Sequence, residues 1–455
     1  MTVERAVDQA VPTTSSGRRR LLLRLAIPAT LTLMAEPILS VVDTAIAGRI
    51  GTVELGALGL ATSLLAGLTW VFNFLVFGTT STVSQALGRG DHEAAGRRVA
   101  HAGIVAIGLG VLAAIAIAAL APAIVTLAGA VDELVAPTVA YLRVRAIGVP
   151  FMLAAFVGHG AFRGAGDTTR PLVVVLVANV VNLALNLVLV FGLGWELEGI
   201  ALATVVAEVI TAVWLAVMAR RNLGFELGGH GLPDRRQMEA LAVVSRDLFL
   251  RTAALVGAIM VISAAAARVG TETAAAHQVI WQVYLLLSFL LDGLAVAAQT
   301  IMGRAAGAGE RDVLRATVND SLRWAVGVGA LLAVILLVGR PLFVAAFTGD
   351  AVVAALVATA WWLPAVAMPL HALVFVLDGL LMGAEDYAFI RTWTVAGSVL
   401  GAVMAQVGVT LGAGLLWLWI SYEVVMLLRG VPMFLRARGE AWLPDDPAAF
   451  AEARA

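Results

Sequence analysis

The sequence predicts an all-α polytopic membrane protein with twelve transmembrane helices in two six-helix bundles. Of its 455 residues, 61% are apolar and 13% are charged, and the mean hydropathy is +0.94. Soluble globular domains carry about 25% charged residues, so this composition is typical of a membrane protein. Apolar runs of membrane-spanning length recur along the chain, and the second half repeats motifs of the first half. Together these observations predict the two-bundle architecture.

The expected spans follow from the apolar runs, because a membrane helix needs about 20 predominantly apolar residues. The polar tail at 1–20 has no signal-peptide pattern, so the first span is expected to stay in the mature protein. A second polar tail is expected at 437–455. The twelve spans are expected near 21–48, 55–86, 99–121, 134–160, 172–192, 199–219, 241–267, 274–303, 321–339, 353–380, 390–412 and 414–436.

The loops between these spans carry unequal numbers of arginine. One side of the membrane is expected to show only Arg49, Arg268 and Arg340. Because arginine gathers in the cytoplasmic loops of membrane proteins, both termini are expected in the cytoplasm. The expected location is a bacterial-type plasma membrane. The arginine-rich loops read "RGDHEAAGRR", "FRGAGDTTRP", "RRNLGFELGGHGLPDRR" and "GRAAGAGERDVLR".

An internal repeat divides the chain into two lobes. A shift of 219 residues places Pro150 on Pro369 and Gly160 on Gly379, and it superposes "RIGT" on "RVGT" and "GAGD" on "GAED". Because each half has six spans, the second half crosses the membrane in the same orientation as the first. This predicts lobes related by a pseudo-two-fold axis along the membrane normal. Such a repeat favours an alternating-access carrier over a duplicated structural scaffold. The expected domains are the lobes 21–219 and 241–436 and the cytoplasmic linker 220–240.

Several functional classes find no support in the sequence. The absence of cysteine excludes disulfides and thiolate metal sites, and a net charge of −1 argues against a nucleic-acid partner. There is no GxxxxGKS or GxxxxGKT phosphate loop, and the "GAGD" and "GAED" segments are interpreted as tight turns, so nucleotide-driven transport is not expected. No nucleophile and base pair or metal-ligand spacing indicates an intramembrane enzyme. Neither a cofactor nor a resident metal is expected.

Three polar residues are expected to share one depth in the first lobe. Asp43, Asn186 and Thr204 each lie five or six residues from the predicted outer end of their helix. At a rise of about 1.5 Å per residue, this depth is about 8 Å. A carboxylate at the middle of a membrane helix costs about 2.5–3.5 kcal/mol on insertion scales, so it needs a partner, a proton or a function. The shared depth predicts a polar pocket around Asp43.

Neighbouring residues extend this predicted pocket. Asn179, Asn182 and Asn186 follow an i, i+3, i+7 pattern on one helix face, and Glu208 lies one turn after Thr204. Hydrogen bonding between packed helices is an equally good interpretation of any single asparagine.

The second lobe does not repeat the pocket, because the 219-residue shift places Asp43 on Ile262. The cation chemistry is therefore expected in the first lobe. Polar residues at helical spacing in the eighth and tenth spans are interpreted as a substrate-facing or proton-handling surface, since no tight ligand spacing supports a metal site. The substrate-cleft candidates are Asn73, His277, Gln278, Tyr284, Ser288, Asp292, His371 and Asp378.

Five longer motifs are spread over residues 21–436. They are "VDTAIAGRIG", "FRGAGDTTRPL", "NVVNLALNLVLVFGLG", "GIALATVVAE" and "AAHQVIWQVYLLLSFLLDGLAVAAQ". Taken together, they resemble the multidrug and toxic compound extrusion (MATE) family, in its DinF-like branch. The resemblance implies a carrier in the lipid bilayer that exports amphipathic organic small molecules, driven by inward flow of H⁺ or Na⁺. The carrier is expected to be a monomer.

The resemblance also implies roles for individual positions. Matched residue by residue, the family's cation site falls on Asp43, Asn182, Asn186 and Thr204, and Pro28 matches the proline at which this branch is thought to bend. Relatives with a well-defined Na⁺ site often carry aspartate where this chain has Asn186. Asp43 is then the only formal carboxylate at the cation unless Glu36 or Glu208 helps, which favours H⁺ as the coupling ion over Na⁺.

Two points stay open at the level of sequence. Glu36, followed by Pro37, is either a further member of the site or an acid that binds backbone groups freed by the proline. A lipid-linked oligosaccharide flippase of the same wider superfamily is the alternative function. It would be expected to have extra helices and a cationic cleft, and only Arg143 and Arg145 inside a predicted span favour it.

Overall fold

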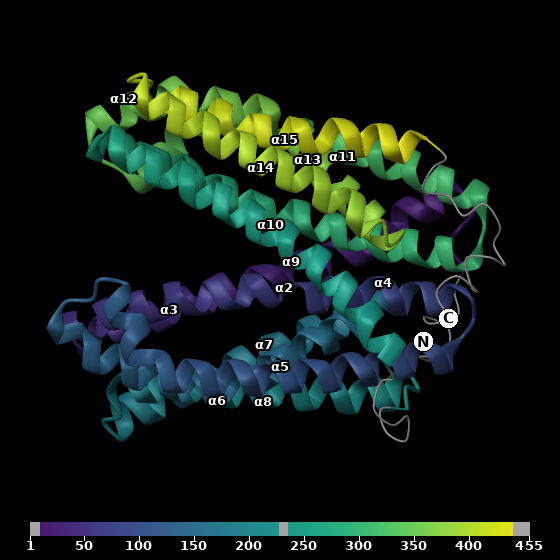
Figure 1. Cartoon of the computed structure of the whole chain (residues 1–455), viewed down its shortest axis with the longest axis horizontal. Coiled ribbons are helices and arrows are strands. Elements are labelled where there is room, and N and C mark those ends of the chain that lie inside the picture. The colour runs from purple at the N-terminus through teal and green to yellow at the C-terminus, as the bar shows by residue number, and fades with distance from the viewer. Residues whose placement is uncertain (1–9, 227–234, 440–455) are drawn as a thin grey trace. The chain divides into compact units, whose positions relative to one another are not determined.

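The computed structural model describes residues 10–226 and 235–439, which are helical throughout, with short connections and no strand. Figure 1 shows these helices along the chain. They are α2 (Ser15–Ile50), α3 (Thr52–Phe72), α4 (Phe74–Gly88), α5 (His92–Leu127), α6 (Asp132–Gly164), α7 (Thr169–Asn186), the π-helix η1 (Leu187–Gly192), α8 (Glu196–Asn222), α9 (Arg235–Val269), α10 (Thr271–Ala308), α11 (Arg311–Phe347), α12 (Ala351–Ala360), α13 (Trp362–Gly383), α14 (Tyr387–Thr410) and α15 (Leu415–Arg438).

The predicted all-α membrane fold is confirmed. Within the described residues, 11 helices are long and apolar enough to cross a membrane. The predicted second span, 55–86, is made of α3 and α4, which are separate helices with Asn73 between them. The predicted tenth span, 353–380, is made of α12 and α13, with Trp361 between them. Each of the twelve predicted spans therefore has a helical counterpart.

The helices form two compact units. Unit 1 contains α3 to α8, α2 from Leu31 onward and the start of α9 up to Ala240. Unit 2 contains α9 from Leu241 onward, α10 to α15 and the first part of α2, up to Thr30. The predicted first lobe began at residue 21, whereas residues 21–30 group with the second half of the chain. Packing explains this difference, because a Cβ on Gly293 of α10 would lie 1.9 Å from Thr30 Oγ1. Only a glycine lets this part of α2 approach α10 so closely.

An ion pair also anchors the first part of α2 within unit 2. The buried Arg18 donates to Asp320 Oδ2 of α11 from Nε, at 2.8 Å. Beside it, the Arg19 guanidinium lies 4.7 Å from the centre of the Trp324 ring. These contacts tie the start of α2 to α11.

The sequence repeat corresponds to a repeated packing contact. In unit 1, a Cβ on Gly110 of α5 would lie 2.5 Å from Pro150 Cα of α6. In unit 2, a Cβ on Gly329 of α11 would lie 2.5 Å from Pro369 Cα of α13. Gly329 and Pro369 lie 219 residues after Gly110 and Pro150, respectively. The two halves therefore pack corresponding helices through the same backbone contact.

Candidate functional site

A chain of hydrogen bonds starts at Asp43 and crosses three helices of unit 1. Asn186 Nδ2 donates to Asp43 Oδ1 at 2.8 Å and to Asn182 Oδ1 at 2.9 Å. Asn182 Nδ2 in turn donates to Thr204 Oγ1 at 3.2 Å. Asp43 belongs to α2, the two asparagines to α7 and Thr204 to α8. The structure thus brings together the four residues on which the sequence analysis placed the cation site.

Burial and local helix geometry hold this chain in place. Asp43 is 8% exposed, and Asn182 and Asn186 are 0% exposed. The asparagines lie one turn apart on α7, and the chain changes to the π-helix η1 directly after Asn186. Short π-helical segments are frequent at functional sites, because they shift side chains relative to the regular helix. The Thr204 hydroxyl donates to Ile200 O at 3.0 Å, which leaves its oxygen free to accept from Asn182.

One hydrogen-bond acceptor among these linked side chains is available to a further donor. Asn186 Oδ1 is buried and has no hydrogen-bond partner within the described part of the chain. A protonated carboxyl group is a donor, whereas a carboxylate only accepts. The pair of Asp43 and Asn186 therefore contains acceptors that suit either a proton on the carboxyl group or a small cation.

Glu208, which the sequence analysis placed in the pocket around Asp43, is paired with an arginine. Its two carboxylate oxygens accept from both terminal nitrogens of Arg145 of α6, each at 2.8 Å. Gly148 makes room for this ion pair, because a Cβ there would lie 2.0 Å from Glu208 Oε2. Arg145 also interacts electrostatically with Asp43 and Glu36, so the ion pair borders the site. Sequence reasoning left Arg145 without a role, although a guanidinium inside a span needs an acidic partner and Glu208 was available.

The remaining first-lobe candidates lie outside the hydrogen-bond chain. Asn179 Nδ2 donates to the backbone oxygen of Ala35 on α2 at 3.3 Å, which fits the helix-packing interpretation. Glu36 is exposed. Pro28 lies inside α2, three residues before Leu31, where the helix passes from unit 2 to unit 1. Arg143 is exposed, and its Nε donates to Ala118 O at 3.4 Å.

Most of the predicted cleft residues of the second lobe lie inside unit 2. His277, Tyr284, Ser288, His371 and Asp378 are buried. Gln278 is exposed, and Asn73 and Asp292 are half-buried. Within the described residues, 10–226 and 235–439, no group of three or more His, Cys, Asp or Glu side chains could hold a metal ion.

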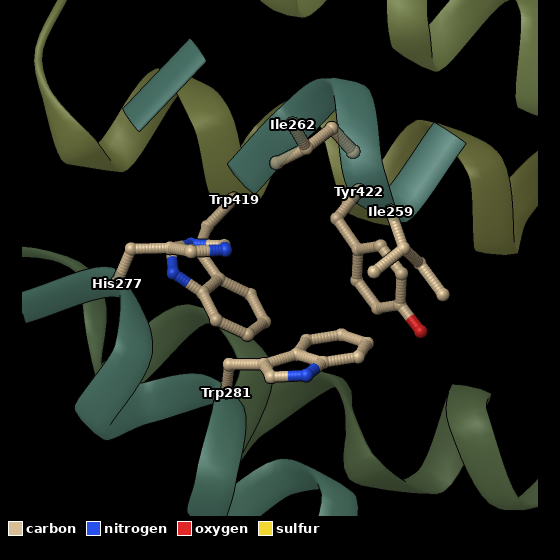
Figure 2. Close-up of a pocket in the computed structure, with 6 residues that line it drawn as sticks. All are labelled: Ile259, Ile262, His277, Trp281, Trp419 and Tyr422. Atoms are coloured by element: carbon tan, nitrogen blue, oxygen red, sulfur yellow. The ribbon is translucent and has the colours of Figure 1, made fainter. Parts of the chain in front are cut away.

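His277 lies in an aromatic cluster that the sequence analysis did not identify. Figure 2 shows its ring beside Trp419 and Trp281, with Tyr422, Ile259 and Ile262 closing a small cavity. His277 also makes a polar contact, because its Nε2 lies 3.2 Å from Ser263 Oγ. The cluster joins α9, α10 and α15. Trp419 and Tyr422 could have been found from their spacing of three residues on one helix face.

His371 and Asp378 of α13 face charged partners that the sequence analysis also missed. His371 Nε2 lies 2.8 Å from Glu423 Oε2 of α15. Asp378 Oδ2 accepts from Arg251 of α9 at 2.6 Å and also from Arg429 of α15. These partners were hard to find, because contacts between helices distant in sequence depend on how each helix is rotated.

Comparison with known proteins places the chain among membrane transporters. The family model MatE matches residues 28–188 and 248–407. The chain is 32% identical to Protein DETOXIFICATION 44, chloroplastic, of Arabidopsis thaliana, over 90% of this chain and 80% of that protein. It is 27% identical to DNA damage-inducible protein F of Escherichia coli (strain K12), over 90% of each chain. A crystal structure of a MATE in the bent conformation superposes with a TM-score of 0.88 at 19% identity, covering 100% of this chain and 99% of that one.

Proposed function

Because the chain belongs to the MatE family of membrane transporters, we propose that it exports amphipathic organic compounds in exchange for inward H⁺, with Asp43 as the residue that binds the proton. As a MATE protein, it is an integral membrane transporter of the multidrug efflux family. The exchange mechanism, the coupling ion and a bacterial-type plasma membrane with cytoplasmic termini are parts of the proposal.

The observation that carries the proposal is the environment of Asp43. Its carboxylate is buried in unit 1 and accepts its hydrogen bond from the neutral amide of Asn186. Arg145, which borders the site, is already paired with Glu208, so a charge on the buried Asp43 is costly, and protonation removes that cost. A proton needs only one carboxyl group, whereas a dehydrated Na⁺ ion gains most from several oxygens and nearby negative charge. The neutral amides of Asn182 and Asn186 therefore favour H⁺, and Na⁺ is the less favoured ion.

In the proposed cycle, Asp43 is deprotonated and bound by Asn186 while the substrate is held. A proton from outside then neutralises the carboxylate and weakens this hydrogen bond. We expect α2 to bend about Pro28, because proline removes a backbone hydrogen bond from the helix at that point. The position of Pro28, close to where α2 passes between the units, supports this assignment. Substrate release follows, and the proton leaves to the cytoplasm on return.

The energy available to one proton is sufficient for export. One charge that crosses 100 mV supplies about 2.3 kcal/mol, which sustains roughly a fifty-fold gradient of a neutral substrate.

The ion pair of Arg145 and Glu208 bears on the alternative function. The flippase interpretation rested on cationic residues inside a span, because a lipid-linked pyrophosphate needs positive charge. Arg145 is neutralised by Glu208, and Arg143 is exposed. Neither residue therefore favours a flippase over an exporter of organic compounds.

Transport into inside-out vesicles tests the proposal, with ethidium as a fluorescent amphipathic probe. We expect uptake to stop when a protonophore removes the proton gradient and to continue when only the Na⁺ gradient is dissipated. The reverse result would assign Na⁺. Matched vesicles without the protein define the background.

A further inference from the structure

A small cavity lies within unit 2, where the first part of α2 meets α10 and α11. Arg18 and Arg19 line it from α2, Ile301 from α10, and Asp320 and Trp324 from α11. All five residues belong to unit 2, whereas the candidate coupling site at Asp43 belongs to unit 1. The cavity is therefore separate from the site of the proposed function.

The cavity lies at one edge of the membrane. Three predicted spans end or begin beside it, namely 21–48, 274–303 and 321–339. Arg19, Ile301 and Asp320 are each one or two residues from the nearest of these boundaries. Because the hydrocarbon core ends where the apolar runs end, the cavity is at the depth of the lipid headgroups. Arginine and tryptophan are typical of this depth.

The side chains around the cavity carry excess positive charge. The buried Arg18 donates from Nε to Asp320 Oδ2 at 2.8 Å, and Arg323 Nη1 lies 3.9 Å from Asp320 Oδ1. The Arg19 guanidinium lies over the Trp324 ring and has no acidic partner in the described part of the chain. Three guanidinium groups and one carboxylate leave two positive charges, which favours a ligand with an uncompensated negative charge.

A buried hydroxyl group at the cavity has no partner. Thr317 of α11 lines the cavity and is 2% exposed, and its Oγ1 makes no hydrogen bond within residues 10–226 and 235–439. By contrast, Thr300 and Thr392 each donate to a backbone oxygen one helical turn earlier, at 3.0 and 2.8 Å. Buried polar atoms are nearly always paired, so the Thr317 hydroxyl needs a further acceptor. A phosphate oxygen provides one.

Exposed apolar side chains continue from the cavity into the membrane. On α2, Ile27 follows Arg19 by eight residues on the same helix face and is 58% exposed. On α11, Leu331 and Ile335 follow Trp324 by seven and eleven residues and are 59% and 41% exposed. Residues at these spacings share one face of a helix. A phosphate group at Arg19 thus has apolar surface beside it for acyl chains, which favours a phospholipid over free phosphate.

We propose that this cavity binds the phosphate group of an anionic phospholipid. Arg19 supplies the positive charge, Thr317 supplies a hydrogen-bond donor, and the exposed apolar faces of α2 and α11 accommodate the acyl chains. Arg18 is already held by Asp320 and fixes the start of α2 beside the lipid. The site depends neither on the transported compound nor on the coupling ion.

Native mass spectrometry of the purified protein in a neutral detergent tests the proposal. The probes are phosphatidylglycerol, phosphatidylcholine, which adds a cationic choline to the same phosphate, and inorganic phosphate. We expect phosphatidylglycerol to bind about tenfold more tightly than phosphatidylcholine, and this difference to shrink as ammonium acetate is raised. Inorganic phosphate lacks acyl chains and is not expected to displace phosphatidylglycerol at equal concentration.

A charge substitution with a matched control locates the lipid phosphate. Arg19→Gln removes the positive charge at the cavity, whereas Arg20→Gln removes the neighbouring exposed arginine, which is not part of the lining. We expect Arg19→Gln to weaken phosphatidylglycerol binding roughly fivefold, which corresponds to about 1 kcal/mol. Arg20→Gln is expected to have a clearly smaller effect.

A hydroxyl substitution tests the hydrogen bond. Thr317→Val removes the unpaired hydroxyl and keeps a side chain of similar shape. We expect weaker binding of phosphatidylglycerol, while the Tm of the lipid-free protein stays the same or rises, because an unpaired buried hydroxyl does not stabilise the fold. Thr392→Val is the matched control, since the Thr392 hydroxyl already donates to Ala388 O.

Each contrary outcome has a distinct meaning. Equal binding of the two phospholipids, or equal losses in Arg19→Gln and Arg20→Gln, would overturn the site and leave only general surface charge. Unchanged lipid binding in Thr317→Val would mean that the cavity holds water alone. Displacement of phosphatidylglycerol by an equal concentration of inorganic phosphate would overturn the choice of a lipid. Thermal unfolding without lipid checks that each variant is folded, and no measurement relies on transport, so the result is independent of the proposed function.

Discussion

Asn186 donates a 2.8 Å hydrogen bond to Asp43 from the last residue of α7, directly before the chain changes from an α-helix to a π-helix. The bond connects α7 to α2, the helix that contributes to both units. A change in the charge of Asp43 therefore acts on a contact between these two helices.

Asp43→Asn is expected to abolish coupled export while leaving expression and folding intact. The amide keeps the shape of the side chain but cannot bind and release a proton. Ethidium uptake into inside-out vesicles should fall to the background of vesicles without the protein. Thr44→Val is the matched control, because the neighbouring Thr44 hydroxyl donates to Ser40 O instead. Undiminished export by Asp43→Asn would remove Asp43 from the mechanism.

Pro28→Ala is expected to slow turnover more than it weakens substrate binding. Alanine restores the backbone donor that proline lacks, so the helix resists bending where the cycle requires it. A roughly tenfold lower rate corresponds to about 1.4 kcal/mol in the barrier. Ethidium binding and initial transport rates should be measured on the same preparation. Pro37→Ala, at the other proline within the membrane part of α2, serves as the comparison, and equal rates for Pro28→Ala and unaltered protein would show that no bend is needed.

Asn186→Asp is expected to shift the coupling preference towards Na⁺. The substitution places a second carboxylate within hydrogen-bond distance of Asp43, and two such groups repel unless a cation or a proton lies between them. Export driven by a Na⁺ gradient alone, with the proton gradient dissipated, should appear in this variant. The hypothesis fails if the unaltered protein already shows full export under that condition.

Glu208→Gln is expected to destabilise unit 1 by leaving Arg145 without its charged partner. Breaking a buried ion pair on one side costs on the order of 3–5 kcal/mol, whereas replacing both partners with apolar side chains is often close to neutral. Both side chains are largely buried, at 11% and 16% exposure. Thermal unfolding in detergent should therefore show a lower Tm for Glu208→Gln and recovery in the double variant Arg145→Met, Glu208→Leu. A single variant as stable as the unaltered protein would mean that water or lipid already compensates the pair.

The sequence was sufficient for the fold and for the positions that share the depth of Asp43. Apolar run length predicts spans well, because every backbone polar group in a membrane must be paired within its own helix. Depth along a helix follows from residue count, which is how Asp43, Asn186 and Thr204 were grouped. Side-chain partners on different helices are harder to predict, because they depend on how each helix is rotated about its axis. The pairing of Glu208 with Arg145 and of His371 with Glu423 came only from the structure.

The 219-residue shift shows a related limit. It was applied to Asp43 and the asparagines of the fifth span, which meet apolar or small residues in the second half. The same shift applied to Thr204 would have reached Glu423. Glu423 differs in residue type from Thr204 although its position is equivalent, so a search for identical residues at equivalent positions did not find it.

The first part of α2 belongs to unit 2, although nearly all of unit 1 separates it from the rest of that unit along the chain. A fragment that begins in the linker at 220–240 would therefore lack the segment that packs on Gly293 and supplies the partner of Asp320. Severed halves expressed together should reassemble only if the N-terminal piece supplies residues 10–30 to the C-terminal piece. Unit 2 is therefore completed by a segment from near the N-terminus, and the two duplicated halves of the chain are not structurally equivalent.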